Sequence, residues 1–186
     1  MTDKYNVILA DPPWKYSSGR TGGERKKGAT GKGGCEKHYP TMTNKELLQM
    51  SLFVRAMAAP QCVLFLWVTM PQIEFALKLM KAWGFKYKTN GFTWVKTTKD
   101  GNSFVYGPGG YTGSNVELCL IGIKGPYQKP AKGMMPSVIT TPRLDKHSQK
   151  PDVHGAIEHL YPHVPKIELF ARRPMFGWTV WGNEVA

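Results

Sequence analysis

The most restrictive feature of the sequence is an apolar run that ends at two successive prolines. The run Tyr5–Ala10 has the composition of a buried parallel strand, and Asp11 behind it is followed by Pro12 and Pro13. Proline cannot donate a hydrogen bond to a sheet, and it disfavours helix in the residue before it, so the chain must stop and turn at Asp11. A carboxylate is therefore predicted at the carboxyl end of a strand, where open α/β sheets bind their ligands.

The tetrapeptide Asp11-Pro12-Pro13-Trp14 combines three groups that suit a flat base carrying an amino group. Asp11 can accept one amine hydrogen, the Pro12 carbonyl can accept the other, and Trp14 can stack on the ring. The simpler alternative is that Asp-Pro-Pro only ends a strand. The tetrapeptide alone does not decide between the two.

Length and charge bound the fold and the kind of ligand. The 186 residues fit one domain with an ordinary core, so a second recognition domain is not expected. The chain has 25 Lys and Arg against 13 Asp and Glu, an excess that favours a polyanionic partner such as nucleic acid. No apolar stretch is long enough to span a bilayer, and no secretory signal is visible. We therefore expect a cytoplasmic domain.

Cysteine and histidine give no sign of a metal centre. The three cysteines form no Cys-x-x-Cys pair, and Cys62 and Cys119 lie inside apolar runs, where cysteine is usually a small core residue. The five histidines show no metal-ligand spacing. We expect reduced cysteines and no metal.

Strand and helix patterns alternate along the chain and predict a parallel α/β sheet. Strands are expected at Tyr5–Ala10, Cys62–Trp67, Phe92–Lys96, Val116–Ile123, Lys166–Phe170 and around Val180 and Trp181. A first helix should run from the capping box Thr43–Glu46 to about Ala58, with Leu47, Leu48 and Met57 among its apolar positions. A second should follow Pro71 and end at Gly84, burying Ile73, Leu77, Met80 and Trp83, and a third should run from near Pro151 to Leu160.

Two long loops, residues 15–40 and 124–149, interrupt this pattern and concentrate the basic charge. Residues 15–37 hold seven basic and two acidic side chains, and residues 124–150 hold six basic and one acidic. Both loops are candidates for phosphate contacts, with Arg25, Lys26 and Lys27 the densest basic group. The alternative is that the charges only keep the loops solvated.

Six motifs occur in an order that resembles a known enzyme family. They are Asp11-Pro12-Pro13-Trp14, Phe65-Leu66-Trp67-Val68, Trp94-Val95-Lys96-Thr97, Glu117-Leu118-Cys119-Leu120, His147-Ser148-Gln149-Lys150-Pro151, and Lys166-Ile167-Glu168-Leu169-Phe170 with Trp181-Gly182-Asn183-Glu184 behind it. Over residues 6–184 the chain resembles the N6-adenine methyltransferases typified by the catalytic subunit of the mRNA adenine methyltransferase. In its short length it is similar to the prokaryotic and phage members.

The resemblance implies a Rossmann-like sheet with helices on both faces and S-adenosylmethionine as the cofactor. It also implies a permuted order, with the catalytic tetrapeptide before the cofactor-binding strand. The reaction would be methyl transfer to the N6 amine of adenine, in DNA rather than RNA because the short relatives are prokaryotic or viral. Three alternatives stay open: an RNA substrate, another amine such as that of cytosine, and a non-catalytic nucleic-acid-binding subunit. A homodimer or a partner subunit is also compatible with so small an enzyme.

The resemblance further assigns roles to individual residues. Asp11, Pro12, Pro13 and Trp14 would be catalytic. The cofactor would be bound by Lys150, Glu168, Arg172, Asn183 and Glu184, and the target base and its strand by Tyr39, Trp67, Tyr111 and Glu117. Two positions depart from the family. Only Met1 to Tyr5 precede the first strand, where relatives carry an acidic residue, and Arg173-Pro174 stands where eukaryotic members have Pro-His.

Overall fold

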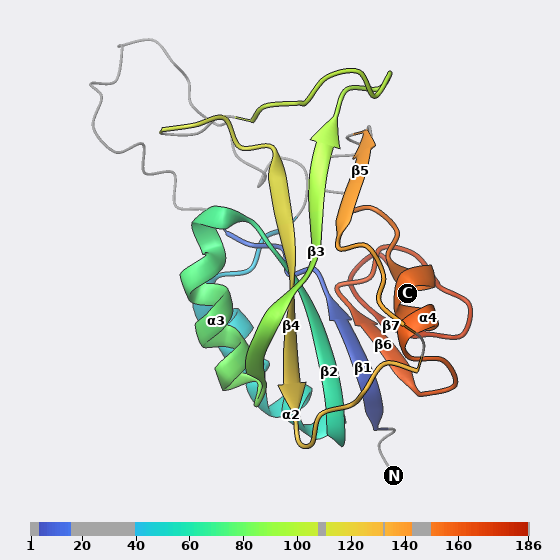
Figure 1. Cartoon of the computed structure of the whole chain (residues 1–186). Coiled ribbons are helices and arrows are strands. Elements are labelled where there is room, and N and C mark those ends of the chain that lie inside the picture. The colour runs from blue at the N-terminus through green and yellow to red at the C-terminus, as the bar shows by residue number, and fades with distance from the viewer. Residues whose placement is uncertain (1–3, 16–39, 108–110, 132, 143–149, 186) are drawn as a thin grey trace.

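A mixed sheet forms the centre of the computed structural model, which describes residues 4–15, 40–107, 111–131, 133–142 and 150–185. Within these residues the sheet has seven strands in the order β5-β3-β4-β2-β1-β6-β7 (Figure 1). Their bounds are β1 Tyr5–Ala10, β2 Ala58–Val68, β3 Lys86–Thr97, β4 Val116–Lys124, β5 Val138–Pro142, β6 Lys166–Leu169 and β7 Thr179–Trp181. The six predicted strands are all present, and β2 and β3 are longer than predicted.

Helices cover both faces of this sheet, as Figure 1 shows for α3 and α4. One face carries α1 (Asn44–Gln49), α2 (Ser51–Met57) and α3 (Ile73–Ala82), the last preceded by a 3-10 turn at Met70–Gln72, and the other carries α4 (His154–Leu160). The predicted Rossmann-like α/β fold is confirmed. None of the helices in the described ranges combines the length and the apolar character that crossing a bilayer requires.

The prediction of an all-parallel sheet was wrong at β4. The pairs β1–β2, β1–β6, β6–β7 and β3–β5 are parallel, but β4 runs antiparallel to both β2 and β3. A parallel return needs a crossover, usually a helix. The segment between β3 and β4 contains no helix in its described residues, 98–107 and 111–115, which we call the arm. The chain therefore comes back beside itself, and the arm projects beyond the end of the sheet (Figure 1).

The interpretation of residues 124–149 as a loop was also wrong in part, because β5 lies inside it. This strand pairs with β3 from Thr93 opposite Val138 to Thr97 opposite Pro142. It is short, lies at the edge of the sheet and ends in a proline, and none of its residues is buried. Such a strand carries little of the apolar periodicity by which strands are found in a sequence.

The predicted start of the first helix is confirmed, whereas two residues predicted on the apolar faces of the helices, Leu48 and Leu77, are exposed. The capping box is confirmed: the Thr43 hydroxyl accepts the Glu46 backbone N–H at 3.3 Å, and Glu46 Oε2 accepts the Thr43 backbone N–H at 2.7 Å. The single predicted helix is divided at Met50 into α1 and α2, and Leu48 is exposed. On α3 the buried side chains are Ala76, Leu79 and Met80, whereas Leu77 is exposed. Met80 and Trp83 of the predicted stripe are buried and Ile73 packs against the core, so Leu77 is the one member of that stripe that was wrong.

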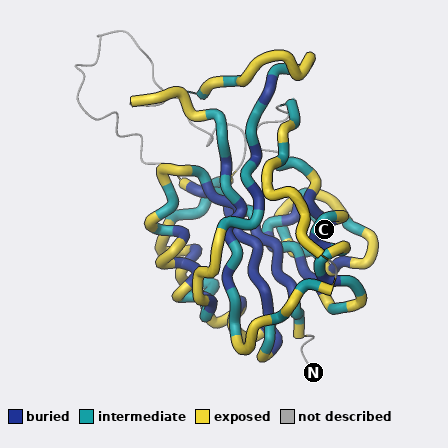
Figure 2. Tube along the Cα trace, in the orientation of Figure 1, coloured by how far each residue is buried: buried dark blue, intermediate teal, exposed yellow. Residues whose placement is uncertain are grey.

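Two apolar clusters sandwich the sheet, and β1 contributes to both by alternation. Ile8 and Ala10 pack toward α1, α2 and α3. Val7 and Leu9 pack toward α4. Figure 2 shows the central strands as the most buried part of the chain and the arm as mostly exposed. Cys62 and Cys119 are free and buried in these clusters, which confirms their prediction as core residues.

We expect Gly125→Ala to destabilise the fold by about 2 kcal/mol or more. Gly125 follows β4 with φ +71°, and a Cβ atom there would lie 2.1 Å from the Pro60 carbonyl oxygen, so the backbone would have to move. Gly155→Ala on α4 is the matched control, because its Cβ would meet nothing within 4 Å. That control should be neutral or slightly stabilising. Urea unfolding measures both variants, and an unchanged Gly125→Ala midpoint would contradict the argument.

Candidate active site

The carboxyl end of β1 meets the ends of four other strands at one end of the sheet. By 'this edge' we mean the row of strand ends beside Asp11. Ala10, the last residue of β1, lies opposite Leu66 of β2 and Leu169 of β6. Because β4 is antiparallel to β2 and β3, its first residues reach this same edge, and so do the last residues of β3. Residues far apart in the sequence therefore gather beside Asp11.

Alternation along the strands directs the polar side chains at this edge to a single face. Leu9 and Cys119 pack toward α4. Glu117 lies two positions before Cys119 in β4, and Asp11 lies two positions after Leu9, directly behind β1, so both continue the alternation and point to the α4 face. Trp94 of β3 lies opposite Glu117 and also packs in this cluster. Lys96 follows on the same face, with its ammonium 4.8 Å from the centre of the Trp94 ring.

Lys150 joins two of these side chains. Its Nζ lies 3.3 Å from Asp11 Oδ1 and 2.8 Å from Glu117 Oε2. Glu117 also accepts a hydrogen bond from Lys96 Nζ through its other oxygen. The exposed fraction of the side chain is 7% for Glu117, 13% for Lys150 and 21% for Asp11, so the charges compensate one another largely out of water. We call Asp11, Lys96, Glu117 and Lys150 the charged cluster.

The two carboxylates of the charged cluster are held differently. Burial raises the pKa of both, but Lys150 and Lys96 together bring the pKa of Glu117 below its usual 4.5. Burial raises the pKa of Asp11 by more than the attraction of Lys150 lowers it. The negative charge of Glu117 raises the pKa of Asp11 as well, so this pKa lies above the usual 3.8. Burial lowers the pKa of Lys150, yet Asp11 and Glu117 more than compensate and raise it. Asp11 is therefore the more basic carboxylate.

Backbone contacts fix the tetrapeptide. The Trp14 N–H donates to the Pro12 carbonyl at 2.8 Å, which closes a three-residue turn, and the Met42 N–H donates to the Pro13 carbonyl at 2.8 Å. The Pro12 carbonyl keeps a second lone pair for another donor. The turn therefore presents Asp11 and this carbonyl on a rigid backbone.

The structure does not place Trp14 as a stacking platform. Its side chain is 4% exposed, it meets Phe75 edge to face, and its indole N–H donates to the Trp67 carbonyl at 3.2 Å. These contacts cover the ring surface that would lie on a base. Trp67 is also a core residue, 2% exposed on β2. The two rings lie in opposite apolar clusters, Trp14 on the side of the sheet that α1, α2 and α3 cover and Trp67 on the α4 side.

Apart from Lys150, the residues predicted to bind the cofactor lie on β6, just after it, and in the turn after β7. Glu168 is on β6, and its Oε2 lies 2.8 Å from His154 Nε2. Arg172 Nε lies 3.6 Å from Glu184 Oε1, and the charge of Arg172 also lowers the pKa of Asp11, so it lies within electrostatic reach of the cluster. Asn183 is exposed in the same turn as Glu184.

Gly182 allows this turn to approach the chain after β6. A Cβ atom at Gly182 would lie 2.3 Å from the Ala171 carbonyl oxygen, closer than any side chain could be placed. The Ala171 N–H donates to the Trp181 carbonyl at 3.0 Å on the same side. The glycine therefore brings Asn183 and Glu184 toward Arg172.

Of the remaining predicted residues, the structure describes Tyr111 alone. Tyr111 is fully exposed on the arm. Tyr39 and the basic residues Arg25, Lys26 and Lys27 lie outside the described residues. In the described ranges, no three His, Cys, Asp or Glu side chains are close enough to share a metal ion.

Sequence reasoning assigned no role to Lys96 or His154. Lys96 stands two positions after Trp94, at the end of an apolar strand, where a lysine on the buried face needs an acidic partner. Glu117 on the expected neighbouring strand could have suggested that partner. His154 carried no such signal, because Glu168 comes from β6, whose packing against α4 was not yet known, and Asp152 two residues earlier is not by itself a sign of a role.

We expect Lys150→Met to destabilise the protein by about 3–5 kcal/mol at neutral pH, because it removes the cation paired with Asp11 and leaves Glu117 with Lys96 alone. The pKa of Glu117 is lowered in the fold, so its stabilising contribution is present above pH 4.5 and is lost as the pH falls through the lowered value. The difference between variant and wild type should therefore shrink in acid. Urea unfolding at neutral and acidic pH tests this, with exposed Lys88→Met as the control. An equal loss for both variants would contradict it.

Comparison with known proteins identifies the family of the chain. The MT-A70 family model matches residues 5–184. The Type II methyltransferase M.MunI of Mycoplasma sp. is 36% identical over 191 residues, which cover 98% of this chain and 78% of M.MunI. The human N(6)-adenosine-methyltransferase catalytic subunit METTL3 is 30% identical over 186 residues, 98% of this chain but 28% of METTL3. The N6-methyladenosine RNA methyltransferase MTA1 of Cryphonectria parasitica is 27% identical over 188 residues, 97% of this chain and 52% of MTA1. The chain therefore belongs to the MT-A70 family of adenine N6-methyltransferases.

Proposed function

We propose that this protein transfers a methyl group from S-adenosylmethionine to the exocyclic N6 amine of adenine in DNA. The observation that carries the proposal is the position of Asp11. Its carboxylate stands at the carboxyl end of β1 on a rigid turn and is held by Lys150 in a largely buried charged cluster. This is a costly arrangement for a residue that only ends a strand, since the pKa of Asp11 is raised by its burial.

The side chains at this edge fit the cofactor chemically. S-adenosylmethionine supplies a methyl group on a sulfonium, and it carries ribose hydroxyls and a carboxylate by which a protein can hold it. Glu168 uses one oxygen for His154, so the other is available to accept from the ribose hydroxyls. The Lys150 ammonium has three donors and contacts two carboxylates, which leaves a donor for the cofactor carboxylate, and Arg172 would add a second cation.

The tetrapeptide would act on the amine itself. The lone pair of an adenine amino nitrogen is delocalised into the ring, so the amine is a poor nucleophile. Hydrogen bonds from its two hydrogens to Asp11 and to the free lone pair of the Pro12 carbonyl would favour a pyramidal nitrogen and direct its lone pair at the methyl group. The raised pKa of Asp11 also suits this carboxylate to accept the proton that the nitrogen loses.

The relatives favour DNA over RNA, and the surface favours a nucleic acid of either kind. The chain spans most of the bacterial Type II methyltransferase but little more than a quarter of METTL3, so the bacterial protein is the better guide to its whole activity. The net charge of +12 favours a polyanionic partner. Phe104, Tyr106 and Tyr111 are exposed on the arm, which leaves the sheet one residue after Lys96 and offers surfaces on which unpaired bases can stack. A base inside a duplex would have to be flipped out to reach Asp11.

Asp11→Asn should abolish most turnover without weakening the fold. The loss of the carboxylate should lower kcat by about 10²-fold to 10³-fold, the usual effect of removing one transition-state partner. The pKa of Asp11 is raised in the fold, so ionised Asp11 opposes folding at neutral pH and its removal should not lower the unfolding midpoint. The assay incubates each protein with S-adenosylmethionine and unmethylated duplex DNA, single-stranded DNA or RNA, and identifies methylated nucleosides by mass spectrometry.

The outcomes of this assay separate the alternatives. N6-methyladenine formed in DNA by the wild type alone supports the proposal. If N6-methyladenine forms only in RNA, the proposed substrate changes from DNA to RNA. Another methylated base would overturn the choice of amine. Cofactor binding without any product would point to a missing partner subunit, and no cofactor binding would favour a non-catalytic role.

Tyr111→Ala should weaken nucleic-acid binding while leaving the fold and cofactor binding unchanged. Stacking of a base on an aromatic side chain is worth about 1–3 kcal/mol, so we expect the Kd for single-stranded DNA to rise about tenfold. Tyr87→Ala is the matched control, because Tyr87 is also exposed but lies near the opposite end of β3. Fluorescence anisotropy with labelled oligonucleotides measures both variants. Equal affinities for the two variants would remove Tyr111 from the binding surface.

A further inference from the structure

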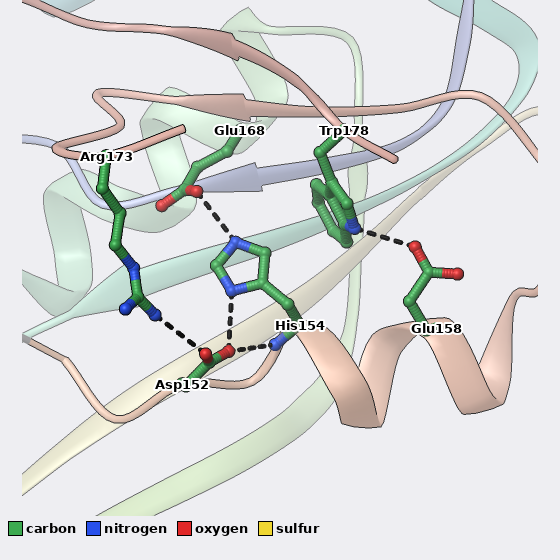
Figure 3. A network of polar contacts seen from close by, with 6 residues as sticks. All are labelled: Asp152, His154, Glu158, Glu168, Arg173 and Trp178. Carbon is green, nitrogen blue, oxygen red and sulfur yellow. Dashed lines mark hydrogen bonds and ion pairs between the residues drawn. The ribbon is translucent and has the colours of Figure 1, made fainter. Parts of the chain in front are cut away.

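His154, the first residue of α4, links two separate parts of the chain through both nitrogens of its ring. Its Nδ1 lies 2.8 Å from Asp152 Oδ1, and its Nε2 lies 2.8 Å from Glu168 Oε2 (Figure 3). Asp152 belongs to the segment before α4, whereas Glu168 is on β6. The ring therefore stands between two carboxylates that the sequence places 16 residues apart, 168 minus 152.

The protons in these contacts can be counted. An ionised carboxylate can only accept, and a neutral imidazole has one N–H, so two such hydrogen bonds require both ring nitrogens to be protonated. Asp152 is held in its ionised form, because it also receives the His154 backbone N–H at 2.9 Å and Arg173 Nη2 at 2.8 Å. Burial raises the pKa of Asp152, but the hydrogen bonds from His154 outweigh burial, and the pKa lies below the usual 3.8. Two accepting carboxylates thus make His154 an imidazolium.

The other groups around the ring do not oppose this charge. Trp178 meets it nearly edge to face, with ring centres 4.8 Å apart and planes at 78°, and brings no charge. Beyond Trp178, Glu158 accepts the indole N–H at 2.8 Å and pairs with Lys166 at 3.0 Å, while Arg173 stands beyond Asp152 (Figure 3). Burial lowers the pKa of His154, yet the hydrogen bonds to Glu168 and Asp152 outweigh burial and raise it above the usual 6.5.

Both carboxylates are connected to the proposed active site. Glu168 is the β6 residue that would accept from the cofactor ribose, and Asp152 lies two residues after Lys150, which contacts Asp11. The imidazolium therefore ties the segment that carries Lys150 to the strand that carries Glu168. A neutral ring could donate to only one of the two carboxylates, and the other would be left facing a lone pair.

We propose that His154 is a positioning residue for the cofactor, whose imidazolium fixes Glu168 with its second oxygen free to bind the ribose of S-adenosylmethionine. This inference rests on the proposed function. Loss of the ring proton would release Glu168 or Asp152, so cofactor affinity should be highest where His154 is charged. Affinity should then fall as the pH rises through the point at which the ring titrates.

The experiment compares the titration of the ring with the binding of the cofactor. Nuclear magnetic resonance of the labelled imidazole follows the protonation of His154 in the wild type, and calorimetry measures the Kd for S-adenosylmethionine across the same pH range without nucleic acid. In the His154→Gln variant the side chain is uncharged and can donate to only one of the two carboxylates. We therefore expect the Kd of this variant for S-adenosylmethionine at neutral pH to rise about tenfold, the effect of one lost hydrogen bond to a charged group. Its pH profile should lack the wild-type step. His159→Gln, exposed on the same helix, should behave as wild type.

The results distinguish a failure of this inference from a failure of the proposed function. A folded His154→Gln variant that binds S-adenosylmethionine with wild-type affinity and pH dependence overturns the positioning role alone. A wild-type protein that does not bind S-adenosylmethionine overturns the proposed function and this inference with it. If His154→Gln does not fold, the wild type decides. A Kd that is constant through the His154 titration overturns the inference, and a Kd that rises with it supports the inference.

Discussion

The arrangement at the ends of the central strands depends on the ion pairs that Lys150 makes with Asp11 and Glu117. The Lys150 ammonium stands between a carboxylate that follows β1 and one that belongs to β4, and these two would otherwise repel each other in a partly dry environment. The raised pKa of Asp11 shows that the compensation is incomplete. Asp11 is thereby kept both in place and basic, a combination that a fully neutralised ion pair would not give.

Much of the fold could be predicted from local signals, and the errors arose where pairing is not local. The apolar run Tyr5–Ala10 and the capping box at Thr43 each specify an element by themselves, and both are present. The direction of β4 depends on what connects it to β3. Alternation of apolar and polar residues indicates a strand but not the direction in which that strand runs in the sheet. The edge strand β5 is held by its pairing with β3 and has almost no apolar signature of its own.

The candidate site was predictable in its identities but not in its geometry. The motifs that resemble the family contain Asp11, Glu117 and Lys150, which the fold brings into contact. They contain Trp14 as well, but its burial depends on Phe75 and on the Trp67 carbonyl, which come from other segments. Lys96 and His154 were given no role for the same reason, because Glu117 and Glu168, which hold them, lie on other strands.

The arm has a consequence for how such an enzyme can change its specificity. Both ends of the arm are fixed by the antiparallel pair β3 and β4, where Val95 lies opposite Val116. Insertions or deletions between these strands therefore leave the register of the sheet and the charged cluster untouched, and the entropy of closing a loop grows only slowly with its length. A segment placed in this way can differ in length without moving the residues of the charged cluster. Under the proposed function, contact with the nucleic acid through the arm and methyl transfer at the charged cluster would be separable tasks within one small chain.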